Sequence, residues 1–361
     1  MQRARNLQFV LLVFSLATAL PSAVAQVVIA TVTVGNDPYA VAVNTATNKT
    51  YVANNSDSTV TVIDGATNNT TTVKNVGFYP DAIAVNQATN KIYVASECGN
   101  DSQCNSPGTV TVIDGGTNNV VATVTAEIYP YALAVNSVAN KIYVSNLCGN
   151  DPECNNSSPG TVTVIDGGTN TVTATVTAQY SPEGVVVNSL TNKIYVANYC
   201  GNDPTCASAG TVTVIDANSN NNTATVTVGV DPGYLALNST TNKVYVSNNC
   251  GSCQSLSTVT VIDANNNNST ATVTVGADSN GIVVNAATNK IYVANFCGND
   301  VTCSQPFSQG TVTVIDAANN NSTSSVNVGF GPQFIDIDSV TNNVYVVNYC
   351  GNDSSCDSPV R

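Results

Sequence analysis

The sequence predicts an all-β protein, a seven-bladed β-propeller of four-stranded antiparallel blades whose last blade is incomplete. One observation is a repeat: the dipeptide Tyr-Val occurs seven times, at spacings of 42 to 53 residues, which suits the period of a propeller blade. The other is the composition of each repeat, where short runs of Val, Thr and Ile alternate with clusters of Asn, Asp and Gly. This pattern is typical of strands joined by tight turns. The dipeptides begin at Tyr51, Tyr93, Tyr143, Tyr195, Tyr245, Tyr292 and Tyr345.

Each repeat is expected to form four strands, as the third repeat illustrates. Its expected strands span residues 131–136, 141–146, 161–166 and 171–178. The last two alternate Thr with Val or Ala, which is the period of two that a sheet requires. A sheet this small can bury both of its faces only against neighbouring sheets, and this favours a radial array. The alternative is a linear β-solenoid, whose coils are usually shorter and do not contain four antiparallel strands.

The last repeat departs from this pattern. Residues 333–348 supply its first two strands, and residues 27–34 resemble an outermost strand that would close the ring. No segment after residue 348 resembles a third strand. The seventh blade is therefore expected to have three strands, unless the sequence is truncated.

Residues 1–25 have the three regions of a secretory signal peptide: Arg3 and Arg5, an apolar run from Phe9 to Leu20, and small residues up to Ala25. A membrane anchor is the alternative, but the run is shorter than the roughly 20 residues that span a bilayer. We expect cleavage after Ala25 and a single propeller domain over residues 26–361. The expected location is outside the cytoplasm: secreted, periplasmic or at the cell surface.

The 12 cysteines fall into six close pairs, which predict six local disulfides in an oxidising compartment. A metal site is the alternative, but each pair belongs to a separate repeat and the chain has no histidine. The pair with only two intervening residues also matches a redox motif, although it does not precede a helix. The pairs are Cys98/Cys104, Cys148/Cys154, Cys200/Cys206, Cys250/Cys253, Cys297/Cys303 and Cys350/Cys356.

The repeats resemble the YVTN-type β-propeller repeat of surface-layer and exported proteins. The motif reads Tyr-Val-Ala-Asn, Tyr-Val-Ser-Asn or Tyr-Val-Val-Asn in six repeats, so the third position departs from Thr, and the second repeat ends in Ser96. A Val-Ile-Asp motif accompanies it at Asp64, Asp114, Asp166, Asp216, Asp263 and Asp316. The resemblance implies a propeller scaffold and no single chemistry.

The charge is strongly negative, with a formal net charge of −13. In an antiparallel blade the connectors that carry the Cys-Gly-Asn-Asp segments emerge on one face, which we expect to be acidic. Such a face repels nucleic acid and attracts a cationic protein or cell-envelope partner. It could also hold Ca²⁺ through oxygen ligands, and the alternative is a solvated rim whose aspartates only stabilise turns. The aspartates of these segments are Asp101, Asp151, Asp203, Asp300 and Asp353.

No catalytic signature is present, because a chain without histidine cannot form a Ser-His-Asp triad. The repeat tyrosines are expected to pack between blades. We therefore predict a binding or structural scaffold without a cofactor, apart from the Ca²⁺ considered above. The alternative is a Ca²⁺-dependent hydrolase or lyase resembling a propeller lactonase. In that case Asp336 and Asp338 would be the only carboxylates of the innermost strands able to approach the centre of the ring.

Overall fold

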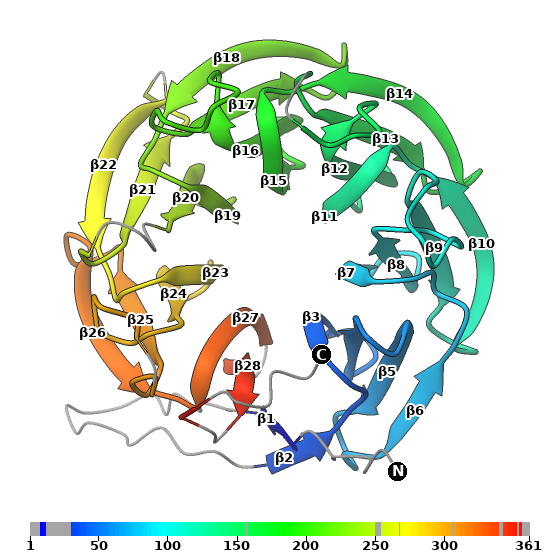
Figure 1. The fold of residues 1–361 in the computed structure, drawn as a ribbon, viewed down its shortest axis with the longest axis horizontal. Coiled ribbons are helices and arrows are strands. Elements are labelled where there is room, and N and C mark those ends of the chain that lie inside the picture. The colour runs from blue at the N-terminus through cyan, green and yellow to red at the C-terminus, as the bar shows by residue number, and fades with distance from the viewer. Residues whose placement is uncertain are drawn as a thin grey trace.

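The computed structural model describes residues 8–11, 30–155, 158–249, 254–266, 268–304, 306–338, 342–351 and 354–355. Strands and turns make up this part of the chain, and no helix occurs in it. Accordingly, no described segment is a helix long and apolar enough to cross a membrane. The strands form small antiparallel sheets arranged around a common axis, with the first strand of every four-stranded sheet innermost (Figure 1).

Six sheets have four strands in chain order from the inside outward. The first three blades are β3 (Pro38–Asn44), β4 (Lys49–Asn54), β5 (Thr59–Asp64) and β6 (Thr70–Val73); β7 (Pro80–Asn86), β8 (Lys91–Ser96), β9 (Thr109–Asp114) and β10 (Asn119–Thr125); β11 (Ile128–Asn136), β12 (Lys141–Gly149), β13 (Thr161–Asp166) and β14 (Thr171–Thr177). The next three are β15 (Tyr180–Asn188), β16 (Lys193–Gly201), β17 (Thr211–Asp216) and β18 (Asn221–Thr227); β19 (Pro232–Asn238), β20 (Lys243–Asn248), β21 (Thr258–Asp263) and β22 (Ser269–Thr274); β23 (Ser279–Asn285), β24 (Lys290–Asn295), β25 (Thr311–Asp316) and β26 (Ser322–Asn327).

The expected count of seven blades, the last with three strands, is wrong, because the described residues form six four-stranded blades. Between the sixth blade and the first stands the two-stranded sheet of β27 (Phe330–Asp338) and β28 (Asn343–Gly351), and β27 contacts both β23 and β3. A second two-stranded sheet, β1 (Gln8–Leu11) with β2 (Ala30–Thr33), lies beside β28. The physical reason is visible in the sequence, where Thr-Val-Thr-Val-Ile-Asp forms every third strand and occurs only six times. β1 lies within the expected signal peptide.

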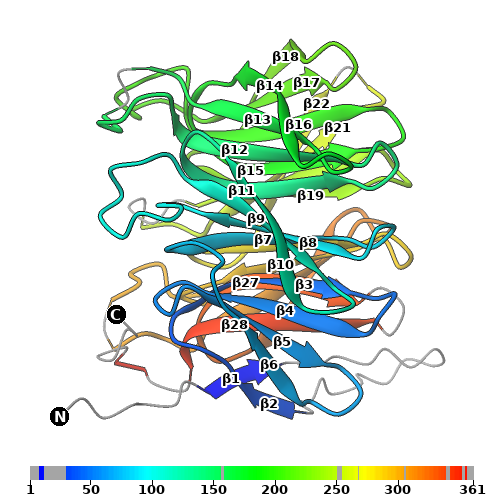
Figure 2. The same ribbon diagram turned by 90° about the vertical axis from the view of Figure 1, so that its right-hand side faces the viewer.

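The strands run along the axis of the ring, so connectors emerge on two faces (Figure 2). We call the face with the connectors between second and third strands the Cys-loop face. The connectors that enter the innermost strands lie on this face too, because Phe78 donates its backbone N–H to Gly99 at 2.6 Å and Asn55 donates to Asp37 at 2.8 Å. The opposite face, with the turns after the first and third strands, is the turn face.

The core lies between blades. Tyr51 of the first blade is completely buried in a cluster that includes Ile92 and Ile113 of the second. Similar clusters fill the other interfaces, and each repeat tyrosine is at most 9% exposed. The expectation that these tyrosines pack between blades is therefore confirmed.

The asparagine that ends the Tyr-Val motif fixes the start of its blade. In β4, Asn54 donates from Nδ2 to the hydroxyls of Thr59 and Thr61 at 3.0 Å, and its Oδ1 accepts the N–H of Gly35 at 3.1 Å. A Cβ at Gly35 would lie 2.6 Å from the Asn54 side-chain carbon, so this position requires glycine. In the second repeat Ser96 replaces the asparagine and donates instead to the Val76 carbonyl at 2.6 Å.

A second asparagine, at the end of each innermost strand, joins neighbouring blades. Asn44 donates from Nδ2 to Oδ1 of Asn90 in the next blade at 2.8 Å. Asn90 has a positive φ, which asparagine tolerates better than most residues. In the last repeat, Asp338 occupies the position that the donor asparagine has in the other repeats. The remaining pairs are Asn86–Asn140, Asn136–Asn192, Asn188–Asn242, Asn238–Asn289 and Asn285–Asn342.

Replacing Asn188 with alanine tests this contact. Asn188 is completely buried, donates to Asn242 at 2.7 Å and accepts the N–H of Leu190. Its loss leaves buried polar groups unpaired, so we expect the free energy of unfolding in urea to fall by about 1–3 kcal/mol. Asn100→Ala, at an exposed asparagine on the Cys-loop face, is the control and should change stability by less than about 0.5 kcal/mol. Equal effects of the two variants would show that the contact contributes nothing.

Candidate binding site at the axis of the ring

Four of the predicted disulfides are present, and each closes a connector between a second and a third strand. They are Cys98–Cys104, Cys148–Cys154, Cys200–Cys206 and Cys297–Cys303. Cys350 is also disulfide-bonded. The other predicted positions, Cys250, Cys253 and Cys356, lie outside the described residues. The bonds suggest an oxidising environment such as the outside of the cell.

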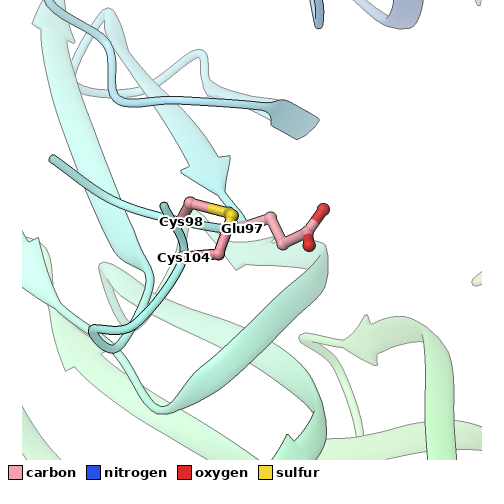
Figure 3. Close-up of side chains that lie close together, drawn as sticks. All are labelled: Glu97, Cys98 and Cys104. Carbon is pink, nitrogen blue, oxygen red and sulfur yellow. A yellow bond between two sulfur atoms is a disulfide. The ribbon is translucent and has the colours of Figure 1, made fainter. Parts of the chain in front are cut away.

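Two of these disulfides have a carboxylate beside them. Glu97 lies next to Cys98–Cys104 (Figure 3), and Asp278 lies next to Cys297–Cys303. A soft metal would need thiolates, whereas these sulfur atoms are bonded to each other. Neither group is therefore a cysteine metal site in this oxidised form.

The aspartates of the Cys-Gly-Asn-Asp segments hold their own turns. Asp101 accepts the N–H of Gln103 at Oδ1 and that of Asn105 at Oδ2, both at 2.9 Å. Asp151 and Asp203 accept backbone N–H groups in the same pattern, and Asp300 accepts the N–H and hydroxyl of Thr302 and the hydroxyl of Ser308. Hydrogen bonds, first from the Thr205 hydroxyl, lower the pKa of Asp203 to about 2. Asp353, the fifth, lies outside the described residues.

The Val-Ile-Asp aspartates have the same role on the turn face, as Asp64 shows by accepting the N–H groups of Ala66 and Thr67 at 3.0 and 2.9 Å. The lysines of this face are also engaged. Lys49 donates to the Gly115 carbonyl of the next blade at 2.8 Å. Lys193 forms an ion pair with Asp216 of its own blade at 3.1 Å.

Asp336 joins the last and first inner strands. Its Oδ2 accepts the N–H of Val43 in β3 at 3.0 Å, and its Oδ1 accepts that of Ile337 at 2.8 Å. Burial raises the pKa of Asp336 to about 6. Asp338, also expected near the centre, is 6% exposed at the end of β27. The expectation that these are the only inner-strand carboxylates is wrong, because Asp81 lies in β7 and Glu183 in β15.

Aromatic side chains from four inner strands meet at the axis, near the Cys-loop face. Phe334 of β27 contacts Tyr39 of β3 and Tyr234 of β19, with ring centroids 4.9 and 5.4 Å apart. Tyr131 of β11 is hydrogen bonded to Tyr39 and Tyr234. Figure 1 shows these four strands around the centre. We call this set the axial aromatic cluster; each member is partly exposed.

Glu183 is a carboxylate whose charge acts on all three tyrosines of this cluster, and Asp81 acts on two of them, Tyr39 and Tyr234. Protein surrounds it on almost every side, and only part of its surface remains open to solvent. Burial, together with the charge of Asp231, raises its pKa to about 8. No hydrogen bond to the carboxylate occurs within the described residues. A Cβ at Gly233 would lie 3.0 Å from its Oε2, so the glycine leaves room for the carboxylate.

Asp81 and Glu97 form a second acidic group on this face. Asp81 is 6% exposed, and burial raises its pKa well above the ordinary value, with a further contribution from Glu97. Asn55 donates to Asp81 at 2.6 Å. Burial also raises the pKa of Glu97, which is hydrogen bonded to Tyr129. The inner acids therefore resist ionisation, in contrast to the turn-capping aspartates.

Sequence reasoning missed the axial residues, although a signal exists for Tyr39, Tyr131 and Glu183. One position of the inner strand, which follows proline in six of the seven repeats, varies from repeat to repeat while its surroundings recur. When the residue at one position varies while its neighbours recur, packing between blades does not determine that residue. The seven residues at this position are Tyr39, Asp81, Tyr131, Glu183, Gly233, Asn280 and Gln333.

Comparison with known proteins supports the architecture. No protein-family model matches the chain, and no curated protein matches its sequence. Hydrazine synthase from Kuenenia stuttgartiensis, a solved structure, is similar over 91% of this chain and 98% of that chain, with a TM-score of 0.66 and 16% sequence identity. The fold is a β-propeller. At this identity the likeness concerns the fold alone, and the YVTN family remains a resemblance that no family match confirms.

The raised pKa of Glu183 predicts a pH-dependent stability. An unfolded chain ionises this group near its ordinary pKa of 4.5, whereas the folded propeller keeps it protonated until about pH 8. The wild type therefore loses stability between these values, and a Glu183→Gln variant should not share that loss. The difference in melting temperature between variant and wild type should grow from pH 5 to pH 8. Glu153→Gln, at an exposed side chain, is the control, and a pH-independent difference for Glu183→Gln would contradict the prediction.

Proposed function

We propose that this protein is an exported β-propeller that serves as a binding scaffold in the periplasm or at the cell surface, with the Cys-loop face as its binding face. The single observation that carries the proposal is the difference between the two faces. On the turn face the recurrent asparagines and lysines bind neighbouring turns. On the Cys-loop face the residues that vary between repeats gather around the axis, and two of them, Asp81 and Glu183, are carboxylates that resist ionisation.

The negative charge of the binding face determines which class of partner it can attract. The Cys-loop connectors carry partly exposed aspartates on disulfide-closed loops, which favours a cationic protein or cell-envelope component and disfavours nucleic acid. A hydrolase or lyase is less well supported, because Asp336 is engaged with Val43 in closing the ring. Asp338, the second aspartate of that alternative, is buried at the end of its strand.

Export has a direct test. We expect the chain, produced in a bacterial host with its N-terminus intact, to leave the cytoplasm and to begin at Gln26. Cell fractionation and N-terminal sequencing measure both outcomes, and substituting the apolar run Phe9–Leu20 with polar residues is the control that should block export. An intact N-terminus on cytoplasmic protein with free thiols would contradict this part of the proposal.

The binding face is tested by comparing turn-capping aspartates on opposite faces. We expect immobilised, disulfide-intact protein to retain a component of purified cell envelopes. A double variant of the Cys-loop face, Asp203→Asn with Asp300→Asn, should weaken retention at low salt. The matched control is Asp64→Asn with Asp114→Asn on the turn face, which removes the same charge from the same kind of cap. No retention, or equal weakening by both variants, would contradict the assignment of the face.

A further inference from the structure

The axial aromatic cluster and Glu183 together have a chemistry that the scaffold does not require. Neighbouring blades already cover each other, and the asparagine pairs join them, so an acid at the axis adds nothing to these contacts. Burying a carboxylate without a partner costs free energy. Ser145 of β12 donates to the backbone carbonyl of Glu183, which fixes the strand but leaves the carboxylate unpaired.

The surroundings of Glu183 are aromatic. Its negative charge acts on Tyr39, Tyr131 and Tyr234, the three tyrosines of the axial cluster, and raises the pKa of each in addition to the effect of burial. The three tyrosines and Glu183 are partly exposed residues near the Cys-loop ends of their inner strands, although protein encloses most of their side chains. A ligand that reaches the axis from this face would contact both the tyrosines and Glu183.

We propose that this end of the axis binds an organic ammonium ion, with Glu183 as its counter-ion and the axial tyrosines as the aromatic faces against which it packs. Such rings attract alkylated ammonium groups through their negative faces, and a nearby carboxylate adds direct charge complementarity. The inference deepens the proposed binding function and rests on it, since it names the class of ligand.

The same residues are a poor site for a metal ion. Ca²⁺ takes six to eight oxygen ligands, typically several carboxylates and carbonyls. Here the acids acting on one another are Glu183 and Asp231, and Asp231 is hydrogen bonded to Tyr199. Aromatic rings add little to a strongly hydrated ion, whereas they suit a weakly hydrated organic cation.

Binding should be linked to a proton. The free protein keeps Glu183 protonated up to about pH 8, while a bound cation favours the ionised form, so binding releases a proton below that pH. The titratable groups around Glu183 are Asp231, Tyr199 and the three axial tyrosines, and Asp81 of β7 acts on two of these tyrosines. The tyrosines stay neutral in this range because burial raises their pKa values.

Calorimetry with the disulfide-intact protein tests the proposal. The probes are choline and its uncharged carbon analogue 3,3-dimethylbutan-1-ol, which differ mainly in charge. We expect choline to bind at least about tenfold more tightly than the analogue, and its affinity to rise from pH 5.5 to pH 8. Glu183→Gln should lower choline affinity at least about tenfold and remove the pH dependence, whereas Glu153→Gln should change neither.

A second variant separates the aromatic contribution. Tyr234→Leu should lower choline affinity by a similar factor. Circular dichroism establishes whether this variant folds. If the variant does not fold, the test depends on Glu183→Gln, which preserves the size of the side chain. Equal binding of the uncharged analogue, or full affinity in Glu183→Gln, would overturn the proposal. The proposal would also be overturned if Ca²⁺ bound stoichiometrically, displaced choline and still bound to the Tyr234→Leu variant. If choline fails to bind while envelope retention persists, the ligand class is wrong and the proposed function stands; loss of both rejects both.

Discussion

Each sheet of this ring has two valine-rich faces, and only its neighbours can shield them from water. That constraint governs the rest of the molecule. Tyr51 and its equivalents are buried because they cross from one sheet to the next, and Ile92 and Ile113 receive them. The asparagine pairs then set the position of each sheet relative to the following one. With the sheets held in this way, the inner strands converge on one axis.

The same constraint divides the residues into two kinds. Those that cover, cap or join sheets recur in nearly every repeat, since each interface has the same requirements. The inner-strand position that follows proline in six repeats does not cover, cap or join sheets, and six different residue types occupy it in the seven repeats. Side chains as unlike as Tyr39, Asp81 and Glu183 can therefore occupy equivalent places, and the ring gathers them at one end. Specificity can change there without disturbing the packing.

Much of the architecture could be predicted from the sequence, because its signals are local. The strand pattern, the disulfide connectors and the turns held by Asp64 all arise within a few residues. The number of blades is six and not the expected seven, and the missing seventh copy of Thr-Val-Thr-Val-Ile-Asp is the local signal for this difference. The axial cluster could not be foreseen, since Tyr39 and Phe334 are almost 300 residues apart and meet only when the ring closes. The bond that Asp336 accepts from Val43 could not be foreseen for the same reason, because the two residues are 293 positions apart.

The asparagine pairs have a consequence for how such a protein can evolve. Each donor recognises only the turn of the following unit, so a duplicated repeat would bring its own donor and its own acceptor. Gene duplication could thus enlarge or reduce the ring without inventing a new contact. The last unit carries Asp338 in place of the donor asparagine, so it is not interchangeable in sequence with the others, and a copy of it placed elsewhere in the ring would not bring the same donor.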